Sequence, residues 1–302
     1  MTSTAEAVTA FMQILGSAKE SLKKILLKGE FDEYPDEKEM HCTARLAEML
    51  NQYSVEIHSK CSENDAKNLF LLNEITVLQE AKAIGLPNFL PRTAFLTLLA
   101  KNIKAISSTP FEFVDKMYGY IENVVVSILM KHSENYPQLL MLMRCAAQNL
   151  VETKKKQLEI WVVDIIEMEK MTDYTCNTEY VSLWNKLVAQ QNAFMEIVND
   201  HRKVPQMKID GYGDVDVSHL RGQVAVIVQE AFDLKMRLTA YWKVVLMRLV
   251  DCMALRLLFS VQNLVNKEME VQIINEIIGP DWNGLERILD ESPAIVEKRR
   301  VA

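Results

Sequence analysis

Two long stretches without glycine or proline constrain the fold of this chain more than any other feature. Neither residue type occurs from Gln138 to Val204 or from Gln223 to Ile278. Glycine and proline are the strongest breakers of regular structure, so each stretch predicts long helix. Unbroken helices of these lengths would extend about 100 Å and about 80 Å at 1.5 Å per residue. The sequence therefore predicts an all-α protein, folded as an elongated antiparallel helical bundle.

The second stretch carries the apolar pattern of a helix that packs along its whole length. Twelve of the fourteen heptad a and d positions from Val217 to Gln262 are apolar, and the exceptions are Arg248 and Gln262. A sustained pattern of this kind is typical of a packing seam. A second apolar stripe begins at Leu246 and continues through Val250, Met253, Leu257, Val261 and Leu264. The two stripes predict neighbours on two sides, one in the same chain and the other in the same chain or another subunit.

Shorter helices and breaks are predicted elsewhere. Three helices are expected over 5–27, 37–58 and 95–106, and Thr109-Pro110-Phe111-Glu112 fits a capping box that opens a helix to about Lys131. The segment 204–216 predicts a loop between the two longest helices, and no segment shows the alternation of a strand. Ser292-Pro293 predicts the start of a short C-terminal helix.

Composition narrows the class of protein. The net charge of −7 argues against a nucleic-acid partner, because such proteins are usually basic. Five widely spaced cysteines and an N-terminus without a basic and then apolar segment predict a cytoplasmic protein with reduced thiols. The most apolar run, 241–265, contains four charged residues and is interpreted as a buried helix rather than a membrane span.

No catalytic, cofactor-binding or metal-binding motif is predicted. The nine glycines do not form a phosphate-binding loop, and Asp210-Gly211-Tyr212-Gly213 matches the short D-x-x-G pattern only within a polar loop. On one helix His41 and His58 would lie about 25 Å apart. His58 and Cys61 provide only two ligands, fewer than a zinc site needs.

Two further residue groups receive ordinary structural interpretations. The basic runs 154–156 and 298–300 are expected to be solvated. Several methionines at helical apolar positions are expected to fill the core, with adaptable partner contact as the alternative: Met141, Met143, Met168, Met171 and Met253.

Two segments resemble a known family. Leu86-Pro87-Asn88-Phe89, separated by five residues from Phe95, resembles the L-P-[GN]-F-x-x-x-x-x-F stretch of the dynamin-superfamily middle domain. The run from Leu289 to Arg300 resembles the end of the dynamin GTPase effector domain. The order of helices between them also fits, and the resemblance is closest to Mx-like and plant dynamin-related proteins.

This resemblance implies a division of the chain. Residues 1–203 would be the middle domain, or stalk; 204–216 the loop between helices; and 217–302 the effector domain, whose residues 292–301 form a bundle-signalling-type helix. Family members are GTPases, but the chain has no P-loop and no T-K-x-D motif. We therefore expect no GTP hydrolysis and no cofactor, with GTP connected to the chain only through its family.

The resemblance also implies assembly. Stalks of this family dimerise crosswise through an apolar patch, which by position would contain Ile165, Met168, Met171, Val261, Leu264 and Val265. Ordinary intrachain core is the alternative for these residues. The loop that contacts lipid or target in relatives would present Arg202, Lys203 and Lys208, although three aspartates make its charge mixed rather than basic.

The main hypothesis is thus a dynamin-like stalk fragment that forms homo-oligomers or joins a full-length dynamin-related protein. It would act in the cytoplasm, at a membrane surface or on microtubules. One alternative is a regulatory subunit that acts on a dynamin-type GTPase in trans. A second is an unrelated helical scaffold or adaptor.

Overall fold

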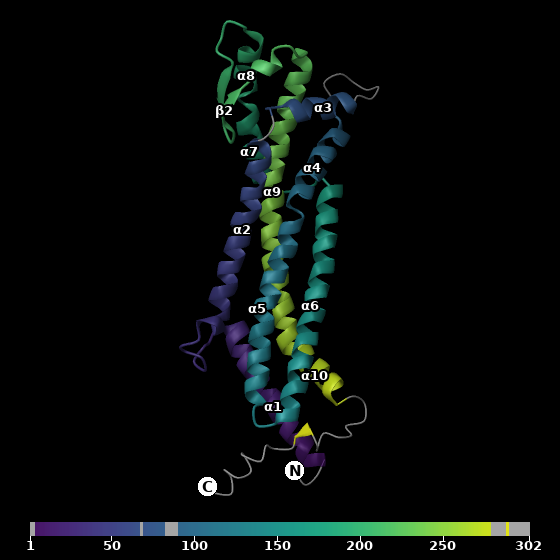
Figure 1. The fold of residues 1–302 in the computed structure, drawn as a ribbon. Coiled ribbons are helices and arrows are strands. Elements are labelled where there is room, and N and C mark those ends of the chain that lie inside the picture. Colours follow the sequence, from purple (N-terminus) through teal and green to yellow (C-terminus); the bar gives the residue numbers. More distant parts are fainter. Residues whose placement is uncertain (1–3, 67–68, 82–89, 279–287, 290–302) are drawn as a thin grey trace. The chain divides into compact units, whose positions relative to one another are not determined.

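The computed structural model describes residues 4–66, 69–81, 90–278 and 288–289 (Figure 1). It confirms an all-α helical bundle, to which one small two-stranded sheet is added. The chain divides into two compact units: unit 1 contains residues 1–53, 110–162 and 252–302, and unit 2 contains residues 54–109 and 163–251. The expected C-terminal helix at 292–301 and the segment Leu86–Phe89 lie outside the described residues.

Unit 1 contains both ends of the described chain. Helix α1 (Thr4–Leu22) continues as a π-helical segment (Lys23–Lys28) and ends at Gly29, whose φ of 71° is the left-handed conformation common after helices. A 3-10 turn (Lys38–Met40) precedes α2 (Cys42–Ala66). Most of α5 (Ser108–His132) and α6 (Pro137–Met171) follow, with the last part of α9 (Ala225–Asn263), a π-helical segment (Leu264–Glu268) and α10 (Met269–Ile277).

The start of α5 differs from the sequence prediction. Thr109 was expected to cap this helix, but the helix begins at Ser108, directly after α4 (Arg92–Ile106) and Ser107. Thr109 is fully buried, and its Oγ1 has no hydrogen-bond partner in the part of the chain that the structure describes. Pro110 therefore lies within the first turn, where its missing N–H leaves no helical hydrogen bond unmade.

Unit 2 is built around the first part of α9. Helix α3 (Leu72–Glu80), α4 and the end of α6 belong to it, as do α7 (Thr178–Val188), α8 (Gln191–Asn199), strands β1 (Gln206–Ile209) and β2 (Gly213–Asp216), and a 3-10 turn (Ser218–Leu220). Phe194 of α8 stacks on Phe232 of α9, with ring centroids 4.5 Å apart. Figure 1 shows α8 and the hairpin beside the beginning of α9.

The first glycine-free stretch is not one helix, so that prediction was wrong. Helix α6 ends at Met171, and α7 begins after Asn177, whose side chain accepts a hydrogen bond from the Glu179 N–H at 2.9 Å. The break contains asparagine, aspartate and threonine, whose side chains form hydrogen bonds with nearby backbone groups and so compete with the hydrogen bonds of a helix. The Tyr241 hydroxyl donates to the carbonyls of Thr172 and Tyr174, each at 3.3 Å, so a tertiary contact satisfies backbone groups of the break.

The segment 204–216 was expected to be a loop without strands, and this was also wrong. Strands β1 and β2 pair antiparallel, from Gln206 opposite Asp216 to Ile209 opposite Gly213. Each strand has only four residues, too few for a clear alternation. The turn contains Gly211 at φ 86° and Gly213 at φ 75°, conformations that favour glycine. The D-x-x-G pattern is therefore a hairpin turn.

The second glycine-free stretch is helical as predicted. Helix α9, the following π-helical segment and α10 cover residues 225–277 without interruption. None of the helices in the described residues combines the length and the apolar character that crossing a membrane requires.

Candidate functional site

Along α9 the buried face changes from one apolar stripe to the other. In unit 2 the heptad positions Ala231, Leu234, Leu238, Tyr241 and Val245 are all buried. In unit 1 the second stripe is buried instead, through Met253, Leu257, Val261 and Leu264. The heptad seam thus loses its intrachain cover after Arg248.

The uncovered part of α9 forms an apolar surface. Leu255, Leu258 and Phe259 are 68%, 58% and 51% exposed. Residues three and four apart lie on one helix face, so these side chains form one patch. We call Leu255, Leu258 and Phe259 the apolar face of unit 1. Heptad counting could have found Leu255 and Phe259, because both lie on the seam.

One cation connects this face to α6. The Arg256 guanidinium lies 5.7 Å from the ring centroids of both Phe259 and Trp161. Such a cation over aromatic faces is attracted by their quadrupoles. Ile160, next to Trp161 on α6, is 64% exposed. The arrangement gives Phe259 a fixed aromatic and cationic neighbourhood at the surface.

Buried polar contacts fix which face of α9 points inward. The hydroxyls of Tyr118 and Ser260 hydrogen-bond at 2.6 Å inside unit 1. Lys154 is buried and its Nζ lies 2.5 Å from Glu268 and 2.9 Å from Gln157. The interpretation of residues 154–156 as a solvated run was therefore wrong for Lys154. Rotating α9 and the π-helical segment that follows it would separate Ser260 from Tyr118 and Glu268 from Lys154, at about 1–3 kcal/mol for each buried group left unpaired.

The structure places the six residues of the expected assembly interface differently from the prediction. Val261, Leu264 and Val265 are buried in unit 1, and Ile165 is buried in unit 2. These four are intrachain core, so the alternative interpretation holds for them. Met168 and Met171 are exposed, at the end of α6 in unit 2. Periodicity does not reveal which stripe the chain itself covers, and an interface through Met168 and Met171 stays a prediction.

The methionines divide in the same way. Met143 and Met253 are buried and fill the core, whereas Met141, Met168 and Met171 are exposed and do not. The prediction of core filling was thus right for two of the five.

The three basic residues of the expected lipid or target loop are all exposed. Arg202 and Lys203 precede the hairpin, and Lys208 lies on β1 directly opposite Asp214. Lys203 pairs with Glu196 at 2.6 Å. Within the described residues, Arg202 and Lys208 make no ion pair. Opposite charges are therefore interleaved here, and the three basic residues do not form a continuous cationic patch.

The metal-ligand residue types are used structurally. His41 stacks on Phe31, with centroids 4.0 Å apart, and His58 Nδ1 lies 2.6 Å from the Ser54 carbonyl oxygen. Among the residues that the structure describes, no three histidine, cysteine or acidic side chains gather in a metal-binding arrangement.

Comparison with known proteins identifies the class of protein to which this bundle belongs. Residues 1–189 match the family model of the dynamin central region, and the chain therefore belongs to the dynamin family. Dynamin-related protein 4C of Arabidopsis thaliana is 46% identical over 301 residues, which is 99% of this chain. The chain spans 44% of the length of that relative.

Proposed function

We propose that the chain is an assembly module of the dynamin family, which binds a second copy of itself through the apolar face of unit 1. The observation that carries this proposal is the exposure of Leu255, Leu258 and Phe259 on a helix whose opposite side is fully packed. Clustered large apolar side chains on a surface are typical of interaction sites. A full-length dynamin-related protein with the same face is a second partner of this kind.

A second copy fits this face for a physical reason. Trp161 and Arg256, which lie beside Phe259, are of the residue types that dominate binding energy at interfaces. A symmetric dimer uses the same patch on both subunits, so a patch without strong net charge can face itself. The three residues of the face are uncharged, and the guanidinium of the adjacent Arg256 lies over the rings of Phe259 and Trp161.

We further propose that this chain contributes assembly and no GTP hydrolysis. The family match covers a central region, and the sequence contains no phosphate-binding glycine loop. Titration with a fluorescent GTP analogue is expected to show no saturable binding. Stoichiometric binding by the purified chain would contradict this part of the proposal.

The assembly proposal is tested by measuring mass in solution. Light scattering across a concentration series up to tens of micromolar should show a mass above that of the 34.7 kDa monomer. Leu258→Asp places a charge in the apolar face and should return the chain to a monomer. Val226→Asp is the matched control, because Val226 is also exposed on α9 but belongs to unit 2.

Two results would overturn the proposal. One is a wild-type chain that stays monomeric at every concentration. The other is a Leu258→Asp variant with the same mass as the wild type and the Val226→Asp control. Circular dichroism of both variants establishes that their helices are intact.

A further inference from the structure

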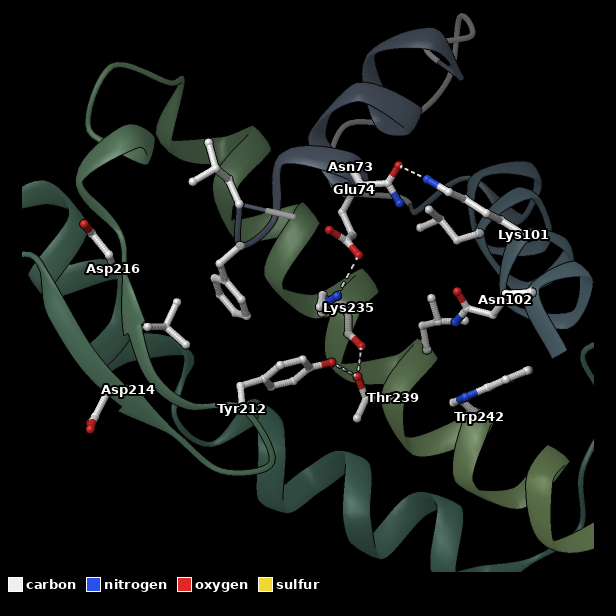
Figure 2. A pocket seen from close by; sticks show the side chains of 16 residues that line it. Asn73, Glu74, Lys101, Asn102, Tyr212, Asp214, Asp216, Lys235, Thr239 and Trp242 are labelled. Carbon is white, nitrogen blue, oxygen red and sulfur yellow. Dashed lines mark hydrogen bonds and ion pairs between the residues drawn. The ribbon is translucent and has the colours of Figure 1, made fainter. Parts of the chain in front are cut away.

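Unit 2 contains a cavity that the assembly proposal does not use. It has a volume of about 460 Å³ and is lined by residues of α3, α4, α9 and the hairpin (Figure 2). This volume is within the range of small-molecule sites, and such sites combine apolar walls with a few placed polar groups. The cavity has that composition, with Leu98 and Leu238 among its apolar residues.

A buried carboxylate faces this cavity. Glu74 is only 3% exposed, and its Oε1 accepts a hydrogen bond from Lys235 Nζ at 3.2 Å. Within the described residues its second oxygen, Oε2, has no hydrogen-bond partner. A buried charge with an unfilled acceptor is costly to maintain. Glu74 therefore offers an acceptor to a hydrogen-bond donor that enters the cavity.

The backbone beside Glu74 is strained. Leu71 has a φ of 65° although it is a large, buried residue at the start of α3. Such a conformation costs about 1–3 kcal/mol and persists only where surrounding contacts impose it. The carbonyl of Phe70 lies 2.8 Å from His219 Nε2, and this contact helps to hold the segment. The first turn of α3, with Glu74, is thus fixed against the cavity.

The opposite wall offers donors and positive charge. Lys101 Nζ donates to Asn73 at 2.8 Å and makes no ion pair in the part of the chain described. Asn102 also lines the cavity, and its side chain makes no hydrogen bond with any described residue. Figure 2 shows Lys101 and Asn102 on α4, across from Tyr212 and Lys235.

The wall formed by α4 suits an anionic group. The lining contains two lysines and three carboxylates, but Lys235 is paired with Glu74, and in Figure 2 the carboxylates of Asp214 and Asp216 point away from Lys235. Lys101 and Asn102 are therefore the donors that an anion would meet. Tyr212 adds an aromatic face, which lies 5.2 Å from Lys235 Nζ. A ligand suited to this lining carries an anionic group for Lys101, hydroxyl donors for Glu74, and a carbon framework against the ring.

We propose that this cavity binds a small phosphorylated polyol. The phosphate would lie at Lys101 and Asn102, and a hydroxyl would donate to Glu74 Oε2. The same chemistry exists as a free metabolite and as a lipid headgroup. The proposal is independent of assembly, because every lining residue belongs to unit 2.

Calorimetry of the full chain with three soluble probes tests this proposal. The probes are myo-inositol 1-phosphate, myo-inositol and inorganic phosphate. Because the proposed site contacts both the phosphate and a hydroxyl of the ligand, the first probe should bind at least about tenfold more tightly than either of the others. Lys101→Met should weaken its binding by about tenfold or more. Lys104→Met is the matched control, since Lys104 is exposed on α4 and does not line the cavity.

Glu74→Gln probes the opposite wall. This substitution retains the size of the side chain and removes the charge. It should weaken the binding of myo-inositol 1-phosphate and leave the binding of inorganic phosphate unchanged. If Glu74→Gln does not fold, Asn102→Leu tests the other wall and should weaken the binding of both myo-inositol 1-phosphate and inorganic phosphate. A wild-type chain that binds none of the three probes below about 10 mM would overturn the proposal. Equal binding by Lys101→Met and the wild type would also overturn it.

Vesicles distinguish the two sources of the ligand. Flotation with phosphatidylinositol vesicles, but not with phosphatidylcholine vesicles, and its competition by myo-inositol 1-phosphate would assign the site to a lipid headgroup. Binding of the soluble probe without flotation would assign it to a free metabolite. Light scattering of Lys101→Met should give the wild-type mass, which separates this site from the apolar face.

Discussion

Arg248 of α9 holds both carboxylate oxygens of Glu169 of α6, with Nε 2.5 Å from Oε1 and Nη2 2.6 Å from Oε2. Both residues belong to unit 2, and Glu169 is buried. The carboxylate raises the pKa of the Arg248 guanidinium. Arg248 also donates to the Tyr241 hydroxyl at 3.3 Å. The charged exception in the apolar seam of α9 is therefore half of a bidentate ion pair.

Removing one partner of this pair should be more damaging than removing both. Arg248→Met leaves Glu169 buried and unpaired, and we expect a loss of about 3 kcal/mol in the free energy of unfolding. The double variant Arg248→Met, Glu169→Leu should recover at least half of that loss. Urea unfolding followed by circular dichroism measures both. Equal destabilisation by the single and the double variant would contradict this explanation.

Substitution by aspartate should have a different effect on each stripe of α9: a loss of stability on the buried stripe and a loss of assembly on the exposed one. Val261→Asp buries an unpaired charge and should lower the free energy of unfolding by about 3 kcal/mol or more. Phe259→Asp alters an exposed side chain, so its stability should stay within about 1 kcal/mol of wild type while its mass in solution falls. Thermal unfolding and light scattering measure the two effects. The expectation fails if Val261→Asp dissociates the chain without destabilising it.

Alanine at two glycines should change stability in opposite directions. Gly16 lies inside α1 with no heavy atom within 4 Å of an added Cβ, so Gly16→Ala should stabilise by about 0.5–1 kcal/mol. At Gly29 the φ is 71° and the added Cβ would lie 2.7 Å from Thr43 Oγ1. Gly29→Ala should destabilise by about 1–2 kcal/mol. Denaturant midpoints of the two variants test this, and a shared sign would refute it.

Acid should weaken unit 1 in two steps. Ser21 Oγ donates to Glu33 at 2.7 Å and lies 3.0 Å from His132 Nε2. Burial lowers the pKa of His132 from 6.5, so the folded state favours the neutral ring and loses stability as the pH falls through the lowered pKa. A hydrogen bond from Lys24, and then one from Ser21, lowers the pKa of Glu33 from 4.5. Its stabilisation is complete above pH 4.5 and is lost as the pH falls through that lowered pKa.

Urea unfolding between pH 8 and pH 3 measures these two losses. His132→Gln should remove the loss that begins below about pH 6.5, and Glu33→Gln the loss that begins below about pH 4.5. Tyr136→Phe is a control without an ionisable change in this range. Identical pH profiles for wild type and His132→Gln would contradict the assignment of the first step.

The sequence by itself determined that the chain is helical and that residues 225–277 form one uninterrupted helical stretch. Both follow from local physics, because an uninterrupted run of good helix formers with 3.6-residue apolar periodicity has few alternatives. The sequence also indicated the dynamin family through Leu86-Pro87-Asn88-Phe89, which the family match confirms. The two apolar stripes of α9, and Arg248 as a charged exception in the first of them, could likewise be identified from the sequence alone.

Only the tertiary structure decided where helices stop and which stripes are covered. The carbonyls of the break after Met171 are satisfied by the Tyr241 hydroxyl, which is 69 residues from Thr172 and 67 from Tyr174 along the chain. Lys154 is buried because Glu268 lies beside it, although its neighbours in the sequence look solvated. Likewise, packing within unit 1 buries Val261 and leaves Phe259 exposed. Periodicity shows that a helix face is apolar, but only packing determines whether that face meets its own chain or remains for a partner.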